Sequence, residues 1–270
     1  MAKSSIPTFG SARFLTTSTQ LWFGVIVIGQ FIFALYILGF YGVNGLAGDF
    51  ERWNANAPHA YLEGDLLSNI FFGMHVALAA IVTIGGPLQL SKKLRAKLPR
   101  IHRISGRIYV FSAFLISFAG LYLAWVKGSV GGLVGAIFIS INGLIIIVCA
   151  FQAIKKAISR QFGEHRKWAI RLFLAMSGVW FFRVFLMLWL TIYQAPVGFD
   201  PETFMGPTLN MLYVVCYILP LILAEVYFRA KKASENHILK SSVASFILLT
   251  TIGIAIGTFS ATMGMWLPNL

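Results

Sequence analysis

The sequence predicts an all-α fold, a polytopic membrane helix bundle of seven transmembrane helices with its N-terminus inside and its C-terminus outside. Three observations carry this prediction: an apolar composition, seven long apolar stretches, and basic residues confined to alternate loops. Of the 270 residues, 58% are hydrophobic and only 11% are charged, whereas a soluble domain carries roughly 25% charged residues. The composition therefore excludes a water-soluble domain, a disordered chain and a disulfide scaffold.

Stretches of about 20 predominantly apolar residues, long enough to cross roughly 30 Å of hydrocarbon, recur seven times along the chain. We place them at 21–41, 66–90, 108–126, 132–154, 168–193, 209–228 and 243–266. The first exceeds the roughly 7–15 apolar residues of a cleaved signal peptide, so we expect a retained anchor. The connecting loops are too short for an independent core, so we expect one membrane domain over 1–270 that contacts the lipid bilayer.

The formal net charge of +13 becomes informative once it is sorted by loop. Of the 22 Lys and Arg residues, 19 fall in the N-terminal segment and in the loops after the second, fourth and sixth stretches. The alternate loops hold only Arg52 and Lys127, and Arg183 lies inside a stretch. By the positive-inside rule the basic side faces the cytoplasm, so the charge indicates topology and predicts no nucleic-acid partner.

Ionisable side chains inside a membrane are costly, so each one marks a candidate functional position. His75 and Arg183 each lie 15 residues from the basic end of their stretch. At about 1.5 Å per residue, both sit about 22 Å above that end. Asn142, Asn210 and Tyr213 fall near the same level. These five residues form a predicted outer polar layer.

A second polar layer is predicted at the cytoplasmic edge of the bundle. Its members are Gln89, His102, Arg107, His165, Arg171 and Glu225. His165 and Arg183 are 18 residues apart, which is five full helical turns, so a straight helix would turn both side chains the same way. We therefore expect polar stripes that link the two layers.

A set of motifs runs through the middle of the chain: His75, Gly85-Gly86-Pro87-Leu-Gln89, Lys92-Lys93-x-Arg95, Pro99-x-x-His102-Arg103-x-x-Gly106-Arg107-x-Tyr109, His165-Arg166-x-Trp168-x-x-Arg171 and Arg183. In these motifs the sequence resembles an uncharacterised bacterial family of predicted membrane proteins, domain of unknown function 2306. The resemblance covers roughly residues 66–230, with the helices at 21–41 and 243–266 outside it. It implies a helical, multi-pass protein of the bacterial inner membrane and assigns no chemistry.

The first hypothesis for the function is a b-type haem protein that moves electrons between a quinone and another partner. Histidines from facing helices commonly hold haem iron in helical bundles. His102 and His165 lie at one depth on adjacent stretches, and His75 is a candidate ligand of a second haem. The chain would then be a subunit of a membrane oxidoreductase, acting with a membrane-protein partner or as a homo-oligomer.

The second hypothesis is binding or transport of an anionic or quinone-like small molecule at a His/Arg polar site. Arg183 needs a counter-charge in the membrane, yet no acidic residue is predicted at its depth. A carboxylate, phosphate or quinone oxygen would supply one. The further candidate ligand-binding residues are Gln89, Arg107, Asn142, Arg171 and Tyr213.

A transition-metal site formed by His75, His102 and His165 is a third hypothesis. Zinc and copper accept histidine ligands, but each ligand must lie within about 2 Å of the ion. Straight helices place His75 about 20 Å from the other two histidines, so no metal site is expected. Signatures of zinc proteases, nucleotide loops and serine nucleophiles are absent from the sequence. The catalytic residues therefore stay unassigned, and the plainest alternative is that these side chains only cap and join helices.

Overall fold

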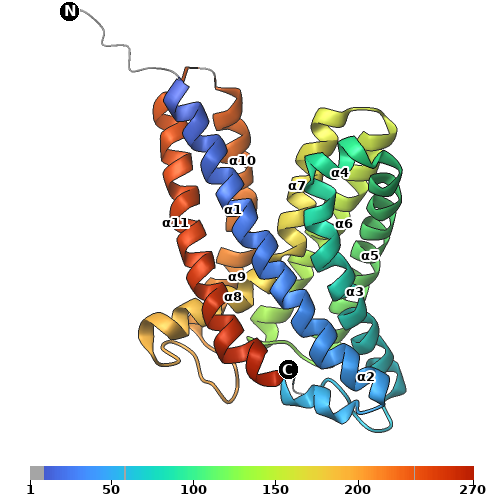
Figure 1. Ribbon diagram of the computed structural model, residues 1–270. Coiled ribbons are helices and arrows are strands. Elements are labelled where there is room, and N and C mark those ends of the chain that lie inside the picture. The colour runs from blue at the N-terminus through green and yellow to red at the C-terminus, as the bar shows by residue number, and fades with distance from the viewer. Residues whose placement is uncertain (1–8, 58, 234) are drawn as a thin grey trace, which may run out of the picture.

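The computed structural model describes residues 9–57, 59–233 and 235–270, and these residues form an all-helical bundle (Figure 1). Over the described residues there is no β-strand, and one isolated β-bridge joins Asp200 and Met205. The predicted fold class, an all-α membrane bundle, is confirmed.

The longer helices are listed here in chain order with their bounds. They are α1 (Phe9–Tyr36), α3 (Leu66–Leu90), α5 (Pro99–Val126), α6 (Gly132–Ile158), α7 (Phe162–Met176), α8 (Gly178–Tyr193), α9 (Pro207–Tyr217), α10 (Leu219–Lys232) and α11 (His237–Ala261). The short elements are η1 (Ile37–Gly42), α2 (Val43–Ala47), η2 (Glu51–Ala55), α4 (Lys92–Lys97), η3 (Thr262–Trp266) and η4 (Leu267–Asn269).

Six helical segments within the described part of the chain are long and apolar enough to cross a membrane, and a bent pair of helices makes a seventh if it counts as one span. The six are Gly10–Ala47, Leu66–Leu90, Pro99–Val126, Gly132–Ile158, Pro207–Lys232 and His237–Asn269. Large apolar side chains are exposed on their outer faces, among them Phe111 and Leu249, both 65% exposed. Such faces would be unfavourable in water and are those of a multi-pass membrane protein in contact with lipid.

Several helices begin at an earlier residue than the apolar stretch that predicted them. The third stretch was placed from residue 108, whereas α5 begins at Pro99, and the fifth was placed from 168, whereas α7 begins at Phe162. Hydropathy marks only the apolar part of a helix, and the first turns of both helices are basic. Pro99 also favours a helix start there, because proline is preorganised for the first helical turn.

The predicted stretch 168–193 is not a straight helix. It divides into α7 and α8, which meet at Ser177 with a bend of 50°. Serine–glycine pairs are common causes of helix kinks, and here the Ser177 hydroxyl donates to the Phe173 carbonyl while Gly178 follows directly. The five-turn alignment expected between His165 and Arg183 is therefore wrong, because the two side chains lie on separate helices that point in different directions.

Side chains from other helices stabilise this break. Gln30 of α1 donates from Nε2 to the Ser177 hydroxyl at 2.8 Å, and Asn142 of α6 donates to the Ala175 carbonyl at 3.2 Å. The ring of Tyr217 lies close to Gly178: a Cβ atom at that position would be 2.6 Å from Tyr217 Cδ1. The break is therefore a packed, buried feature of the fold.

The helices form two groups that join at one end of the molecule (Figure 1). One group packs α3, α5, α6 and α7 in sequence, and the other packs α1 against α11 and α11 against α8. The connection at 91–98, which contains α4, the loop at 159–161 and residues 233 and 235–236 lie at the end where α1 starts, which we call the basic end. Near that end, α7 of the first group faces α10 of the second.

Candidate functional site

Two pockets lie between α7 and α10. The larger, about 420 Å³, is lined by Leu144, Ile145, Val148, Cys149, Trp168, Arg171, Leu221, Ile222 and Glu225. The smaller, about 360 Å³, is lined by Gly163, Arg166, Lys167, Ile170, Tyr227, Phe228, Lys231 and Lys232. On α10 the larger pocket is lined by residues within 221–225 and the smaller by residues within 227–232, and α7 lines both pockets, so together we call them the α7–α10 groove. Each volume is within the range of small-molecule sites, roughly 300–1,000 Å³.

Helical periodicity explains how the sequence builds this groove. On α10, Leu221, Glu225 and Phe228 recur at intervals of four and three residues, and on α7 Lys167 and Arg171 are four residues apart. Residues at these spacings share one face of a helix. The groove is therefore the meeting of two helix faces, with α6 covering one side of the larger pocket.

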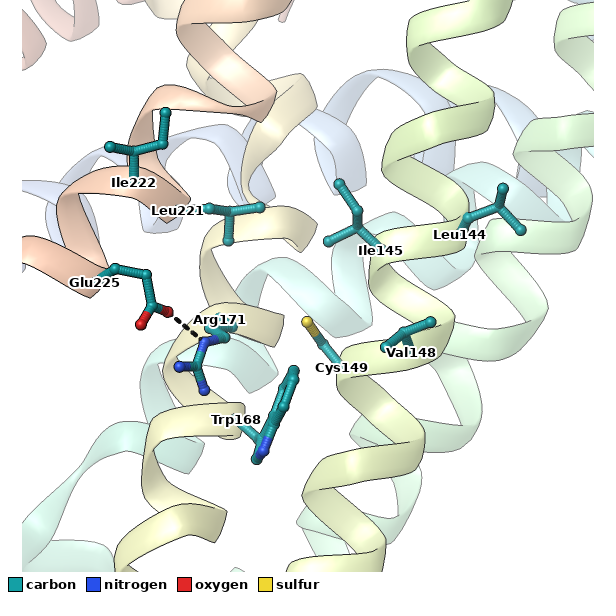
Figure 2. A pocket seen from close by; sticks show the side chains of 9 residues that line it. All are labelled: Leu144, Ile145, Val148, Cys149, Trp168, Arg171, Leu221, Ile222 and Glu225. Carbon is teal, nitrogen blue, oxygen red and sulfur yellow. Dashed lines mark hydrogen bonds and ion pairs between the residues drawn. The ribbon is translucent and has the colours of Figure 1, made fainter. Parts of the chain in front are cut away.

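An ion pair crosses the groove. Arg171 Nε donates to Glu225 Oε1 at 2.6 Å, and Figure 2 shows the two side chains reaching toward each other from α7 and α10. The Arg171 guanidinium also lies 4.4 Å from the centre of the Trp168 ring and 5.3 Å from that of Phe228. The Arg171 side chain is only 18% exposed, whereas that of Glu225 is 47% exposed. This pair ties the two helix groups together at mid-groove.

The character of the groove changes from one pocket to the other. Toward the middle of the bundle, Leu144, Val148 and Ile222 present exposed apolar side chains. Toward the basic end, the groove presents Arg166, Lys167, Lys231 and Lys232. Of these four, Lys167 pairs with Glu164, and no other carboxylate pairs with this set within the described residues. The groove therefore combines an apolar section with a positively charged mouth.

Two of the three predicted haem ligands lie near one another. His165 of α7 is hydrogen-bonded through Nδ1 to the Ala153 carbonyl of α6 at 2.9 Å. His102 of α5 is close enough for its charge to interact with that of His165. Gln89 of α3 contacts both Ser105 and His102. In the amide orientation in which the Gln89 oxygen accepts from the Ser105 hydroxyl, the Gln89 nitrogen lies 3.3 Å from His102 Nδ1. The predicted inner layer is thus partly assembled.

The third predicted haem ligand, His75, lies elsewhere, with Arg183. His75 of α3 faces Gly120 of α5, whose Cβ position is 3.4 Å from His75 Cε1. Its Nδ1 atom is buried without a hydrogen-bond partner among the described residues. The charge of Arg183 on α8 is near enough to interact with His75, in agreement with the shared level predicted for them.

The other predicted ligand-binding residues have structural contacts. Tyr213 donates its hydroxyl to the Val130 carbonyl at 2.5 Å, which fixes the loop before α6. Asn142 supports the α7–α8 break, as described above. Arg107 is exposed on α5. Ligand binding by these three residues stays a prediction.

Sequence reasoning did not identify most of the groove. Trp168, Leu221 and Ile222 were not singled out as site residues, and Glu225 was placed in the inner layer without its partner. The available signal was the shared face of Leu221, Glu225 and Phe228, which repeats at helical spacing. That spacing says that a face exists, but not which helix lies opposite.

Across the part of the chain that the structure describes, no three His, Cys, Asp or Glu side chains form a group that could hold a metal ion. Cys149 and Cys216 are both buried free thiols, and the sulfur of Cys149 points into the larger pocket (Figure 2).

The fold and the groove define a multi-pass helical membrane protein with a basic-mouthed groove between two helix groups. More specifically, the chain belongs to the family of predicted membrane proteins called DUF2306, whose family model matches residues 72–228. The match confirms the resemblance and lies within the 66–230 region assigned to it. No curated protein and no solved structure matches the chain.

Proposed function

We propose that this protein binds an anionic amphiphile in the α7–α10 groove. The apolar part of the ligand lies against Val148, Leu221 and Ile222, and its acidic head lies among Arg166, Lys231 and Lys232. The observation that carries the proposal is that a pocket with mainly apolar walls and a pocket rich in basic residues lie next to each other between α7 and α10.

The charges of the groove favour an acidic head over a neutral one. Arg166, Lys231 and Lys232 are exposed at the basic end. Each Lys or Arg near an anionic lipid surface contributes about 1 kcal/mol to the binding free energy. The Arg171 guanidinium is already committed to Glu225, so it closes the inner end of the charged section. A neutral quinone would use the apolar pocket but gain little from the mouth.

The test is a binding measurement with phosphatidylglycerol and phosphatidylcholine as probes. The protein is purified into nanodiscs of phosphatidylcholine, and the affinity for a fluorescent analogue of each lipid is measured by energy transfer. We expect a preference for phosphatidylglycerol that falls about fivefold for each charge removed in the variants Arg166→Gln, Lys231→Gln and Lys232→Gln.

A matched triple variant controls for general surface charge. Lys93→Gln, Lys97→Gln and Arg100→Gln remove three exposed positive charges at the same end of the molecule, outside the groove. The proposal predicts that this triple variant keeps the lipid preference and that Ile222→Trp, which fills the apolar pocket, reduces it. Equal losses in the two triple variants would overturn the groove as the binding site.

A haem-binding electron-transfer function is a second candidate, supported by one observation. The hydrogen bond from His165 Nδ1 to the Ala153 carbonyl leaves Nε2 of that ring free for a ligand, with His102 nearby, and such second-shell bonds commonly orient histidine ligands. Neither pocket of the groove is lined by a histidine. An absorption spectrum of the purified protein, oxidised and dithionite-reduced, tests this candidate; a Soret band that His102→Ala and His165→Ala remove would support it.

We further infer that the protein sits in the bacterial inner membrane with its basic end toward the cytoplasm, following the positive-inside rule. Both native cysteines are buried, so single exposed cysteines are usable reporters. In intact cells, Glu63→Cys should react with a membrane-impermeant maleimide and Glu235→Cys should not. The reverse labelling pattern would invert the proposed orientation.

A further inference from the structure

Arg183 is a charged residue without a carboxylate partner. It lies on α8, half-buried, with its guanidinium 5.5 Å from the ring centre of Phe33 on α1. The ion pairs within the described residues are Lys167–Glu164 and Arg171–Glu225. Glu225, the carboxylate carried by α10, is therefore committed to another arginine. An arginine cannot lose its proton in a protein, so its charge has to be compensated in another way.

The surroundings of Arg183 are aromatic and rich in hydrogen-bond donors. Its charge interacts with Tyr36, Tyr41 and His75, which come from α1, η1 and α3. Tyr36 and Tyr41 are 4% and 7% exposed. The hydroxyls of Tyr36 and Tyr41 are hydrogen-bonded to each other, which leaves one O–H donor to add to the five N–H donors of Arg183.

Trp266 supplies an independent sign that a ligand belongs here. Its ring lies 5.1 Å from the centre of Phe33, the ring beneath Arg183, and 6.3 Å from that of Tyr36. The side chain is 1% exposed, and its Nε1 has no hydrogen-bond partner among the described residues. An indole N–H can only donate, and leaving a buried donor unpaired is unfavourable. Both this donor and Arg183 require an acceptor.

We propose that Arg183 and Trp266, together with the hydroxyls of Tyr36 and Tyr41, form a binding site for a small monovalent anion. We restrict the ligand to a halide or a one-carbon carboxylate, because the rings of Phe33, Tyr36 and Trp266 pack against one another with centres 5.1–6.3 Å apart. The site is separate from the α7–α10 groove, and none of its residues lines either pocket. It lies toward the end of the molecule where α11 and the C-terminus end (Figure 1).

The α7–α8 bend explains why this arginine is available for an anion. Because the chain turns by 50° at Ser177, α8 directs its residues toward α1 and α11, while α7 directs Arg171 toward α10 and Glu225. The two arginines of this segment therefore have different partners. Arg171 takes the carboxylate, and Arg183 is left with aromatic donors and needs an anion from solution.

The experiment measures thermal unfolding of the purified protein as anions are added. The protein is prepared in a neutral detergent with gluconate, an anion too large for the site, and titrated with chloride, bromide or formate at constant ionic strength. We expect a saturable rise in the unfolding temperature of the wild type with each small anion. Arg183→Gln should abolish this response, and Arg100→Gln, which removes an exposed positive charge, should retain it. The chloride and formate titrations distinguish a halide from a carboxylate as the preferred ligand.

Trp266→Phe keeps the ring and removes the donor, and it provides a second test if Arg183→Gln does not fold. The variant should bind the anion about tenfold more weakly, as expected for one lost hydrogen bond to a charged group. Bromide should also quench a saturable part of the wild-type tryptophan fluorescence, and that part should be missing in Trp266→Phe. A wild type that responds equally to gluconate and chloride, or an Arg183→Gln variant with an intact chloride response, would overturn the proposal. The triple variant of the groove mouth should keep this response, which separates this site from the proposed lipid site.

Discussion

The ion pair between Arg171 and Glu225 should stabilise the contact between the two helix groups, and Glu225→Leu tests this. The substitution leaves the guanidinium, which is 18% exposed, without its acceptor at 2.6 Å. A hydrogen bond to a charged group contributes about 1.5–3 kcal/mol when buried, and an exposed ion pair about 0.2–1 kcal/mol. Since the Glu225 side chain is 47% exposed, solvent screens the pair, and we expect a loss of about 1 kcal/mol.

The assay is thermal unfolding in detergent followed by intrinsic tryptophan fluorescence. A loss of about 1 kcal/mol should lower the unfolding temperature by about 2–4 °C for a chain of this length. The control is Glu164→Leu, which breaks the more exposed pair with Lys167 on a single helix and should give no measurable change.

A double variant tests whether the loss of stability comes from the unpaired charge of Arg171. Arg171→Met with Glu225→Leu removes both charges and replaces them with apolar side chains of similar length. Because the double variant leaves no half-buried charge without its partner, it should recover most of the loss. The reasoning would be refuted by a Glu225→Leu protein as stable as the wild type, or by a double variant less stable than the single one.

Three further predictions concern the break in the fifth span and the loop before α3. Gly178→Ala should lose about 1–3 kcal/mol of unfolding free energy, because its Cβ would lie 2.6 Å from Tyr217 Cδ1. The control is Gly163→Ala: no atom lies within 4 Å of its Cβ position, so this variant should be as stable as the wild type in the same thermal assay. Asn142→Leu leaves the Ala175 carbonyl without its side-chain donor and should lower stability by about 1 kcal/mol, with faster amide hydrogen exchange around Ser177; unchanged exchange there would argue against the support role. Hydrogen bonds from the Ser68 side chain and backbone hold the pKa of the Asp65 carboxyl below its ordinary value of 3.8. The stability from this carboxylate is thus complete above that pH and is lost as the pH falls through the lowered pKa. Asp65→Asn, which still caps α3, should therefore lose less stability than the wild type in an acid titration below about pH 4, and parallel titration curves would contradict this.

The spans could be predicted from the sequence because a membrane imposes a simple length requirement on apolar helices. The segments Gly132–Ile158 and Leu66–Leu90 coincide with predicted stretches to within a few residues. The ends were less predictable where a helix continues into basic residues, as at Pro99 and Phe162. Hydropathy cannot detect a helix in those residues, because it measures transfer into lipid and not backbone conformation.

The bend at Ser177 had a local signal that the straight-helix arithmetic did not use. A Ser-Gly pair in the middle of an apolar stretch is a known cause of kinks, and it occurs at 177–178. Without the bend, His165 and Arg183 were expected on one face, which the structure contradicts. The Arg183 charge lies near enough to His75 to interact with it, while the shared membrane depth of the two residues stays a prediction.

The groove could not be predicted, because its two sides come from helices whose pairing no local pattern specifies. Arg171 and Glu225 are 54 residues apart in the chain. Either residue alone has the appearance of an interfacial charge, which is what the sequence indicated. Only the packing of α7 against α10 turns them into a pair and turns Leu221 and Ile222 into pocket walls.

The bend also explains why Arg171 and Arg183, the two arginines of this segment, have different surroundings. Had 162–193 continued as one helix, Arg171 and Arg183, twelve residues apart, would lie about 120° apart around a single axis and within one helix group. The bend at Ser177 instead assigns Arg171 to the groove between the groups and Arg183 to the aromatic cluster of α1 and η3. Gln30 and Asn142, from opposite groups, both hold the bend. A change in either side chain should therefore affect both proposed sites, whereas a change in Glu225 or Trp266 should affect only its own.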